Sequence, residues 1–377
     1  MQGALLWGIA SGVCHMSASI FAARRERARK LMREQGLDAL LVSHAANRYY
    51  LSGFELHDPQ CNESAGRLIL MTDGQDLLCT DARYDDAAKR LWPEDRVVIY
   101  GQDAPEDIAG RLRDLAGGRR LRLGFEARLI RLDFYERLFA DKSLEAVRAD
   151  GLVEGLRLLK DADEIRRMEA SCRLNRQLMD WLPERLAPGR SEAEIAWDVE
   201  VFFRERGASE LAFASIVARG PNAALPHAVP GRDAVLGAED LVLVDVGCRL
   251  DDYCSDQTRT FWAGANPSPR FRETLALVQE AQARAIEMIR PGVAACDVYA
   301  AARNLFARHN KAHAFTHGLG HGVGLETHEG PALNNRSHTL LEPGMIVTVE
   351  PGLYDAAWGG VRWEHMVLVT ESGHRIL

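Results

Sequence analysis

Hydrophobic and polar positions along the first part of the chain predict short helices and strands. Between residues 19 and 36 the apolar side chains recur at helical spacing, and Gly36 ends that pattern. Further patterns predict strands at residues 38–42, 68–71, 77–80 and 96–100, and a helix at residues 105–115. The residues between the second and third strands, Thr72-Asp73-Gly74, are typical of a hairpin turn. The mixture predicts a small α/β domain over residues 16–150.

Longer helical patterns mark the second part of the chain. They cover residues 163–182, 191–206, 269–289 and 295–309. Strands rich in Val, Ile and Thr lie between and after them. The composition changes around residues 150–165, where charged residues interrupt the apolar pattern, so we place a domain boundary near 150–156. We therefore expect a second domain of mixed α/β (α+β) structure over residues 151–377.

The first 15 residues stand apart from both expected domains. Their apolar stretch, residues 4–13, is shorter than the ~20 residues that cross a bilayer, and no positive segment precedes it as in a signal peptide. Met16, just before the first helical pattern, is an alternative start. We predict a disordered extension over residues 1–15 and no membrane association.

Composition excludes several classes of function. Over 377 residues, 46 Lys and Arg against 54 Asp and Glu give a formal net charge of -8, which argues against a nucleic-acid binder. The seven cysteines form no CxxC pair, so the sequence has neither a zinc-ribbon nor a thioredoxin-like motif. So few cysteines in a chain of this length are typical of a reduced, cytoplasmic protein.

Candidate chemistry begins with two acidic residues inside apolar strands. The segment LVLVDVG contains Asp245, and the segment YCSDQTRTF contains Asp256. A hairpin centred between Leu250 and Asp251 would pair positions whose numbers sum to 501, which places the two acids directly opposite each other. Two bare carboxylates there would repel, and one or two cations would relieve the repulsion.

A second pair of acids has the same arrangement. The segment MIVTVE ends in Glu350, and the segment VRWEHMVLV contains Glu364. These segments also predict a hairpin, with a longer loop between its strands. Four carboxylates on two hairpins would then face each other across one pocket.

Histidines lie between the two expected hairpins. His317 and His321 have the i, i+4 spacing of helical zinc motifs, but the glycines that alternate around them disfavour a helix. Glycine instead lets the backbone pass close to a ligand or metal. His328 lies at the end of the same segment, and His227 lies on a separate stretch flanked by prolines, LPHAVP.

Each of these features has a simpler interpretation. A single strand carboxylate is usually a salt-bridge partner, and a lone loop histidine is usually part of the polar surface. Arg259 and Arg362 lie near the acids in sequence and offer neutralisation without metal. Two matched acid pairs together with the histidine segment favour a metal site over these alternatives.

These residues resemble the pita-bread metallopeptidases, specifically the branch of Xaa-Pro aminopeptidases and Xaa-Pro dipeptidases (prolidases). The matching segments are LVLVDVG, YCSDQTRTF, HGLGHGVGLETHE, TVEPGLY and GVRWEH, together with LPHAVP. Residues 20–150 match the creatinase-type N-terminal domain of that branch more loosely. The resemblance implies a curved, mostly antiparallel sheet with helices, preceded by the smaller creatinase-like α/β domain.

The resemblance implies five metal ligands in this sequence. They are Asp245, Asp256, His321, Glu350 and Glu364. Four carboxylates balance the charge of two divalent cations. The resemblance implies manganese or cobalt, and oxygen and imidazole ligands also suit zinc or iron.

Further roles follow from the same resemblance. It implies Glu350 as the general base, with His227 and His328 assisting the transition state as catalytic residues. The substrate-binding positions of the family fall on His317, Tyr354 and Arg362. Two positions depart from the usual pattern of the branch, because His365 replaces an aspartate and Trp363 replaces a small aliphatic residue.

The implied substrates are peptides with proline at the second position. A dipeptidase must also grip the substrate's C-terminal carboxylate, which needs a well-placed cation. Many microbial dipeptidases of the family have an arginine where this chain has Ala332, and the nearest arginine here is Arg336. We therefore expect an Xaa-Pro aminopeptidase, with the dipeptidase as the alternative. A metal-free creatinase or a non-catalytic relative is less favoured because all five ligand positions are intact.

The N-terminal domain carries none of the implied ligands. In the resembling peptidases it packs between subunits and narrows the active-site mouth of a partner. We therefore expect a homodimer, with residues 49–58 near the neighbouring site. A monomer whose first domain covers its own catalytic domain is the alternative.

Overall fold

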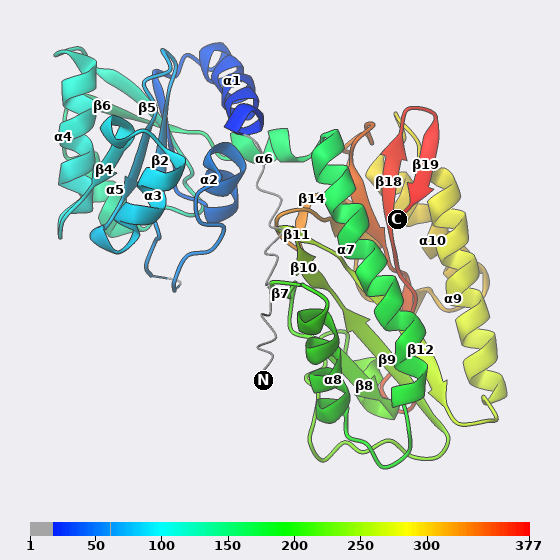
Figure 1. Ribbon diagram of the computed structural model, residues 1–377. Coiled ribbons are helices and arrows are strands. Elements are labelled where there is room, and N and C mark those ends of the chain that lie inside the picture. Colours follow the sequence, from blue (N-terminus) through cyan, green and yellow to red (C-terminus); the bar gives the residue numbers. More distant parts are fainter. Residues whose placement is uncertain (1–17, 61) are drawn as a thin grey trace, which may run out of the picture. The chain divides into compact units, whose positions relative to one another are not determined.

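The computed structural model describes residues 18–60 and 62–377, and the chain divides into two compact units (Figure 1). The first unit ends at Val153 and the second covers Glu154–Leu377, so the short helix α6 (Leu152–Arg157) spans the division. The extension expected over residues 1–15 lies outside the described residues. Within the described part, no helix is long and apolar enough to cross a membrane.

The first unit is built on a six-stranded mixed sheet with the order β4-β3-β2-β1-β5-β6. Its strands are β1 (Ala39–Val42), β2 (Arg67–Met71), β3 (Leu77–Thr80), β4 (Val97–Ile99), β5 (Leu121–Phe125) and β6 (Leu144–Arg148). Its helices are α1 (Ala18–Glu34), α2 (Ala45–Ser52), α3 (Asp85–Leu91), α4 (Ala104–Ala116) and α5 (Leu132–Leu138). The apolar face of α4, with Ile108 and Leu112, packs on the sheet residues Leu41 and Leu123. The small α/β unit predicted from the hydrophobic pattern is thus confirmed as a fold class.

Four long helices shape the second unit. They are α7 (Ala162–Trp181), α8 (Glu192–Glu205), α9 (Pro269–Met288) and α10 (Ala295–Arg308). Local sequence explains where three of them begin. Asp161 and Ser191 each form a capping box with a glutamate three residues on, and Ser268 accepts the backbone N–H of Phe271 at the start of α9. All four agree with the predicted helices to within one or two residues.

The strands of the second unit are all antiparallel and form four sheets. The sheet orders are β12-β9-β8, β11-β10-β7, β14-β13-β15-β18-β19 and β16-β17. The strands are β7 (Glu210–Leu211), β8 (Ile216–Arg219), β9 (Asp240–Val246), β10 (Cys248–Leu250), β11 (Tyr253–Cys254), β12 (Gln257–Ala263), β13 (Gly320–Gly322), β14 (Glu329–Leu333), β15 (Ile346–Val349), β16 (Gly352–Asp355), β17 (Gly359–Arg362), β18 (His365–Thr370) and β19 (Gly373–Ile376).

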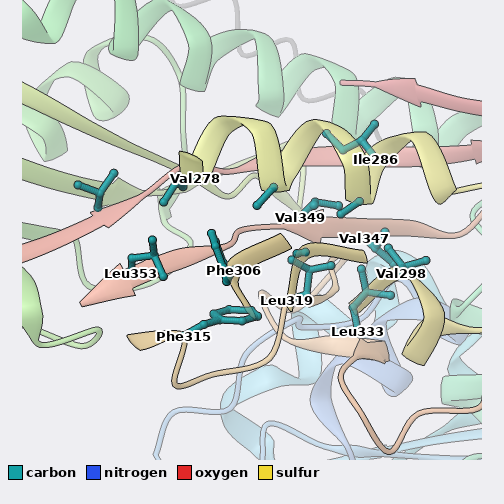
Figure 2. Close-up of a cluster of buried hydrophobic side chains, with 14 of the residues drawn as sticks. Val278, Ile286, Val298, Phe306, Phe315, Leu319, Leu333, Val347, Val349 and Leu353 are labelled. Carbon is teal, nitrogen blue, oxygen red and sulfur yellow. The ribbon is translucent and has the colours of Figure 1, made fainter. Parts of the chain in front are cut away.

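The main core of this unit lies between the five-stranded sheet and the helices α9 and α10. Figure 2 shows Val278 and Ile286 of α9 close to Val347 and Val349 of β15. Burying an aliphatic side chain of this size contributes about 1.5–3 kcal/mol relative to leaving it exposed. The core therefore fixes β15 against α9, and β15 ends one residue before Glu350.

The register of the first acidic hairpin differs from the predicted one. The structure pairs Asp245 with Thr258 and Leu250 with Tyr253, so opposed positions sum to 503 and the turn lies between Asp251 and Asp252. Both turn residues have positive φ, 49° and 73°, as a two-residue hairpin turn of type I′ requires. The prediction that the two acids are directly opposed is therefore wrong.

The predicted register differs from the observed one by two positions, so each side chain still lies on the face of the sheet that was predicted for it. Side chains alternate with a period of two along a strand, so Asp256 still lies on the same face as Thr258, diagonally across from Asp245. The second hairpin has opposed positions that sum to 714 throughout, from Ile346↔Leu368 to Asp355↔Gly359. This register places Glu350 opposite Glu364.

Two segments predicted as single strands are interrupted in the structure. Residues 253–261 form β11 and β12 with Ser255 and Asp256 between them, and residues 361–369 form β17 and β18 with Trp363 and Glu364 between them. Glu350 lies in a similar gap between β15 and β16. Three of the four acids therefore stand where regular strand pairing stops.

Candidate metal centre and active site

The structure brings the five predicted metal ligands together in the second unit. Ligand oxygens of Asp245, Asp256 and Glu364 all lie within 4.8 Å of one another. His321 Nε2 lies 3.6 Å from Asp256 Oδ2 and 3.4 Å from Glu350 Oε1. Two hairpins and β13 thus contribute to one cluster, although they are far apart in sequence.

The orientation of the His321 ring suits a metal ligand. Its Nδ1 lies 3.0 Å from the carbonyl oxygen of Gly322, which can only accept, so Nδ1 carries the hydrogen. The lone pair of Nε2 then faces the carboxylates of Asp256 and Glu350. A lone pair directed at carboxylates is unfavourable unless a cation lies between them.

Glycines bring this histidine close to β14 and β15. A Cβ on Gly320 would lie 2.0 Å from the carbonyl oxygen of Thr348, and a Cβ on Gly322 would lie 1.8 Å from that of Gly330. No side chain fits at either position. The glycines predicted to allow close backbone approach are therefore required by the packing around His321.

The cluster carries more negative charge than its protein neighbours neutralise. Arg362 Nη2 lies 2.7 Å from Asp245 Oδ2 and is the ion-pair partner of that carboxylate. Arg259, the other arginine considered from the sequence, contacts the backbone oxygen of Glu364 rather than a carboxylate. One guanidinium against four carboxylates, three buried and one half-buried, leaves the site short of positive charge.

Burial, together with this imbalance, raises the pKa values of three of the acids. Burial is the largest cause for Asp256, Glu350 and Glu364, and their mutual repulsion, with that of Asp245, adds to it. The pKa of Glu350 rises to about 7, and those of the other two rise well above the usual carboxyl range. Burial has the opposite effect on His321 and lowers its pKa to about 4, so the imidazole is neutral.

Unpartnered oxygens test whether the cluster fits a metal. In the described part of the chain, Asp245 Oδ1 and Glu364 Oε1 are buried without a hydrogen-bond partner. Such atoms are costly unless a ligand satisfies them. Anionic oxygens together with one neutral imidazole are ligands that divalent cations prefer, so the residues fit a metal site.

Four further predicted site residues line the cavity next to the cluster. The cavity has a volume of about 490 Å³, and His227, His317, His328 and Arg362 are among its lining residues. The ring of His328 lies 4.3 Å from that of His321, centroid to centroid. The exposed rings of His227 and His328 are thus available to a molecule bound in the cavity.

A hydrogen-bond chain joins Tyr354, the remaining predicted residue, to His317, Arg362 and the acids. The Tyr354 hydroxyl donates to His317 Nε2 at 2.8 Å and accepts from Arg362 Nη1 at 2.9 Å. The Arg362 guanidinium then reaches Asp245. Burial raises the pKa of Tyr354 and lowers that of His317 to about 4, so both groups are neutral at pH 7.

Two threonines that sequence reasoning missed hold the glutamates. Thr258 Oγ1 donates to Glu364 Oε2 at 2.8 Å, and Thr348 Oγ1 donates to Glu350 Oε1 at 3.2 Å. Thr348 is two positions before Glu350 and Thr258 is two after Asp256. The strand alternation therefore carried a signal, because residues two apart share a face.

Comparison with known proteins identifies the family of this chain. The model of metallopeptidase family M24 matches residues 166–371, and that of the creatinase/prolidase N-terminal domain matches residues 24–159. This chain belongs to metallopeptidase family M24. The resemblance stated from the sequence motifs is confirmed, as is the expected enzyme class, a peptidase.

Relatives of this M24 peptidase match it along nearly its whole length. The Xaa-Pro dipeptidase of Pyrococcus furiosus is 33% identical over 94% of this chain and 97% of its own. The solved Xaa-Pro dipeptidase from Bacillus anthracis is 33% identical with a TM-score of 0.86, covering 94% of this chain and 97% of that one. The X-Pro aminopeptidase from Thermotoga maritima is 30% identical with a TM-score of 0.81, covering 93% and 97%. These likenesses confirm the pita-bread fold with a creatinase-like first domain.

Trp363 and His365, the two residues that depart from the usual family pattern, both contact Arg259 in the structure of this M24 peptidase. The Arg259 guanidinium lies over the Trp363 ring, 4.3 Å from its centroid, and Arg259 Nη2 lies 2.8 Å from His365 Nε2. Burial and the nearby charge of Arg259 lower the pKa of His365 to about 4, so its imidazole is neutral. Neither residue lines the cavity.

Proposed function

We propose that this M24 metallopeptidase is an Xaa-Pro dipeptidase, which hydrolyses the peptide bond of dipeptides with proline in second place. The observation that carries the proposal is the end-to-end similarity to Xaa-Pro dipeptidases, at 33% identity over 94% of the chain. This favours the alternative from the sequence analysis over the aminopeptidase expected there. That expectation depended on one position, Ala332.

The cavity supports a small substrate with an apolar ring. Its volume of about 490 Å³ lies in the range of small-molecule sites. Phe213, Ile216 and Val229 form an apolar part of the wall, and the acids form another part. The apolar part suits the pyrrolidine ring of proline, which carries no polar group of its own.

We assign two divalent metal ions to the acidic cluster, with manganese or cobalt as first candidates and zinc or iron as further ones. The residues that would hold them are Asp245, Asp256, His321, Glu350 and Glu364. Divalent ions there would polarise the scissile carbonyl and lower the pKa of a water molecule. They would also satisfy the unpartnered oxygens of Asp245 and Glu364.

Glu350 is assigned as the general base that takes a proton from the attacking water. Its raised pKa of about 7 is near neutrality, where a base both accepts and releases a proton readily. His227 and His328 would hydrogen-bond the tetrahedral intermediate and assist the leaving nitrogen from the cavity wall. In an X-Pro bond this nitrogen has no hydrogen of its own, so it must be protonated.

The assignment of His227 predicts a selective loss of turnover. We expect His227→Ala to lower kcat by ~10²-fold, the scale of a hydrogen-bonding or acid–base contribution, with little loss of bound metal. Steady-state kinetics and elemental analysis of the same preparation measure the two effects. Wild-type turnover in the variant contradicts the assignment.

An Xaa-Pro aminopeptidase is the second candidate, because one observation favours it. Among the described residues that line the cavity, Arg362 is the only one with a guanidinium, and it is already bonded to Asp245 and Tyr354. Arg336 is exposed and is not a lining residue, and Ala332 carries no charge. A free cation for the carboxylate of a dipeptide is therefore absent from this lining.

A substrate comparison separates the two candidates. Rates are measured on Gly-Pro, Gly-Pro amide and Gly-Pro-Pro, with manganese, cobalt and zinc each added to metal-stripped protein. For a dipeptidase we expect kcat/KM to be at least ~10-fold higher on Gly-Pro than on the other two, because one charge-assisted contact contributes ~1.5–3 kcal/mol. Equal or faster cleavage of Gly-Pro-Pro overturns the dipeptidase and supports the aminopeptidase.

Three broader expectations belong to the same proposal. We propose that residues 16–150 and 151–377 are the creatinase-like and the catalytic domain, that the protein is cytoplasmic, and that it forms a homodimer. Light scattering at micromolar concentration tests the last of these. A mass equal to the single chain's 41.9 kDa excludes the dimer.

A further inference from the structure

A buried glutamine lies in the middle of the apolar face of α9. Gln282 is one helical turn from both Val278 and Ile286, whose side chains lie in the core in Figure 2. Its side chain is only 4% exposed. A buried amide at a core position is unfavourable unless its donors and acceptor all have partners.

Gln282 has partners next to both glutamates of the second hairpin. Its Nε2 donates to the carbonyl oxygen of Val349 at 2.8 Å and to that of Trp363 at 3.0 Å. Val349 directly precedes Glu350 in the chain, and Trp363 directly precedes Glu364. One amide group thus holds the backbone immediately before each of two proposed metal ligands.

Proline explains why a side chain is needed there. In the register of this hairpin Pro351 is opposite Trp363, and the N–H of Trp363 reaches the carbonyl oxygen of Pro351 at 3.4 Å. Proline has no N–H to complete the pair, so the carbonyl oxygen of Trp363 has no ladder partner. The Gln282 amide supplies the missing donor from the neighbouring helix.

His365 and Arg259 fix the orientation of that amide. Because Gln282 Nε2 faces two carbonyls, its Oε1 must accept, and His365 Nδ1 donates to it at 3.0 Å. His365 Nε2 then accepts from Arg259 Nη2. Arg259 Nη1 also donates to the carbonyl oxygen of Glu364, so the chain of hydrogen bonds returns to a proposed ligand.

We propose that Gln282, oriented by His365 and Arg259, is a positioning residue that sets the spacing of Glu350 and Glu364 for metal binding. The inference rests on the ligand set given in the proposed function. None of the three side chains lines the cavity, and their hydrogen bonds near the glutamates go to backbone carbonyls. Their effect therefore passes through the backbone of the two glutamates.

Metal binding without substrate tests the proposal. Cobalt is added to metal-stripped protein, and its affinity is measured by calorimetry and its ligand geometry by visible absorption. Residues that orient metal ligands typically affect affinity or activity by 10–100-fold. We expect Gln282→Leu to weaken cobalt binding by ~10–100-fold and to change the absorption bands, while KM for substrate stays near that of the wild type.

The control is Gln279→Leu, which makes the same chemical change on the same helix at a half-buried position. It should bind cobalt as the wild type does. His365→Phe is the second variant, in case Gln282→Leu does not fold, because it keeps the Gln282 amide and removes the imidazole that orients it and accepts from Arg259. We expect it to weaken cobalt binding several-fold, in the same direction.

The outcomes separate this inference from the proposed function. Wild-type affinity and absorption in both variants overturn the positioning role, even if their melting temperatures fall. A wild-type protein that binds no cobalt instead refutes the proposed ligand set. The choice between dipeptide and longer substrates does not enter the measurement.

Discussion

In the hairpin of β9 and β12, Asp245 lies inside a ladder that runs unbroken from Asp240 to Val246, whereas Glu350 and Glu364 lie where the second hairpin has lost its pairing. The first acid is held by the regular hydrogen bonds of its own strand. The two glutamates depend on side-chain donors that come from other elements, Gln282 on α9 and Thr258 on β12.

This difference indicates what each hairpin contributes to the site. A continuous ladder is rigid but fixes the side chain in one of two directions, up or down from the sheet. A gap frees the backbone to turn a carboxylate toward the cluster, but it leaves polar groups that need new partners. The second hairpin has the freer geometry and therefore the larger set of supporting side chains.

The largest expected effect is on kcat and comes from replacing Glu350, the proposed general base, which lies between β15 and β16. Glu350→Gln keeps the side-chain volume but cannot accept a proton and ligates a cation more weakly. We expect kcat to fall by ~10²–10⁴-fold. Turnover on Gly-Pro at saturating manganese measures it, and activity within threefold of the wild type would sink the assignment of Glu350.

The two threonines compare the hairpins directly. Thr258→Val leaves Glu364 Oε2 and the charged donor Arg362 Nε without a partner. Thr348→Val removes a longer bond to Glu350 and the acceptor of the neutral backbone N–H of His321. We expect both to weaken metal binding within the ~10–100-fold range, with the larger loss for Thr258→Val. Calorimetric titration with cobalt ranks them, and the reverse order contradicts our view that Thr258 is the stronger support.

The pH dependence of metal binding tests whether Glu350 holds a proton in the metal-free protein. Burial and the charge of Asp245 raise the pKa of Glu350 to about 7, so the metal-free protein holds a proton there below that pH. A metal ion must displace this proton, so affinity is full above pH 7 and falls as pH drops through it. One proton changes affinity by up to tenfold per pH unit.

The variant Glu350→Gln supplies the matched control for that experiment. It has no proton to lose at this position. The Glu350 charge raises the pKa values of Asp256 and Glu364, but below pH 7 Glu350 is mostly protonated in the wild type, so these two acids face a neutral group in both proteins. At pH 6 the slope of log affinity against pH should therefore be smaller by about one in the variant. Equal slopes in the two proteins would place the titrating group elsewhere.

The smallest expected effect is at the turn of the first hairpin. Asp251 has a φ of 49°, where glycine is at no disadvantage, but glycine also increases the entropy of the unfolded chain. We expect Asp251→Gly to change the free energy of unfolding by less than ~1 kcal/mol and to leave cobalt binding unchanged. Chemical denaturation checks the first point, and a large shift in metal affinity would mean that the turn sets the position of Asp245.

Helices and strand faces could be predicted from the sequence because their causes are local. Capping boxes at Asp161 and Ser191 mark the starts of α7 and α8. The alternation of residue types around Asp245 and Glu364 indicates which face of each strand points toward the cluster. The register of the first hairpin could not be predicted, because the Asp251-Asp252 turn lacks the glycine that usually marks a type I′ turn.

The supporting residues were beyond sequence reasoning for a different reason. In the sequence, Gln282 is one polar residue in a predicted helix, and neighbouring residues do not show that two backbone carbonyls will face it in the 20-residue helix α9. Thr258 and Thr348 share a strand face with the acids two positions away, but threonine is common in strands, so this alternation does not distinguish them as supports. Acids, histidines and glycines are conspicuous by residue type, whereas a hydrogen-bond donor becomes recognisable only when its distant acceptor is in place.

The glycines on either side of His321 limit which sequences this protein can explore. Any substitution at Gly320 or Gly322 adds a Cβ atom. That atom would lie 2.0 Å from a carbonyl oxygen of β15 at Gly320, or 1.8 Å from one of β14 at Gly322. Even alanine, which has the smallest side chain, collides at either position. In a library of randomised genes selected for activity, both positions should remain glycine while exposed positions of α9 vary.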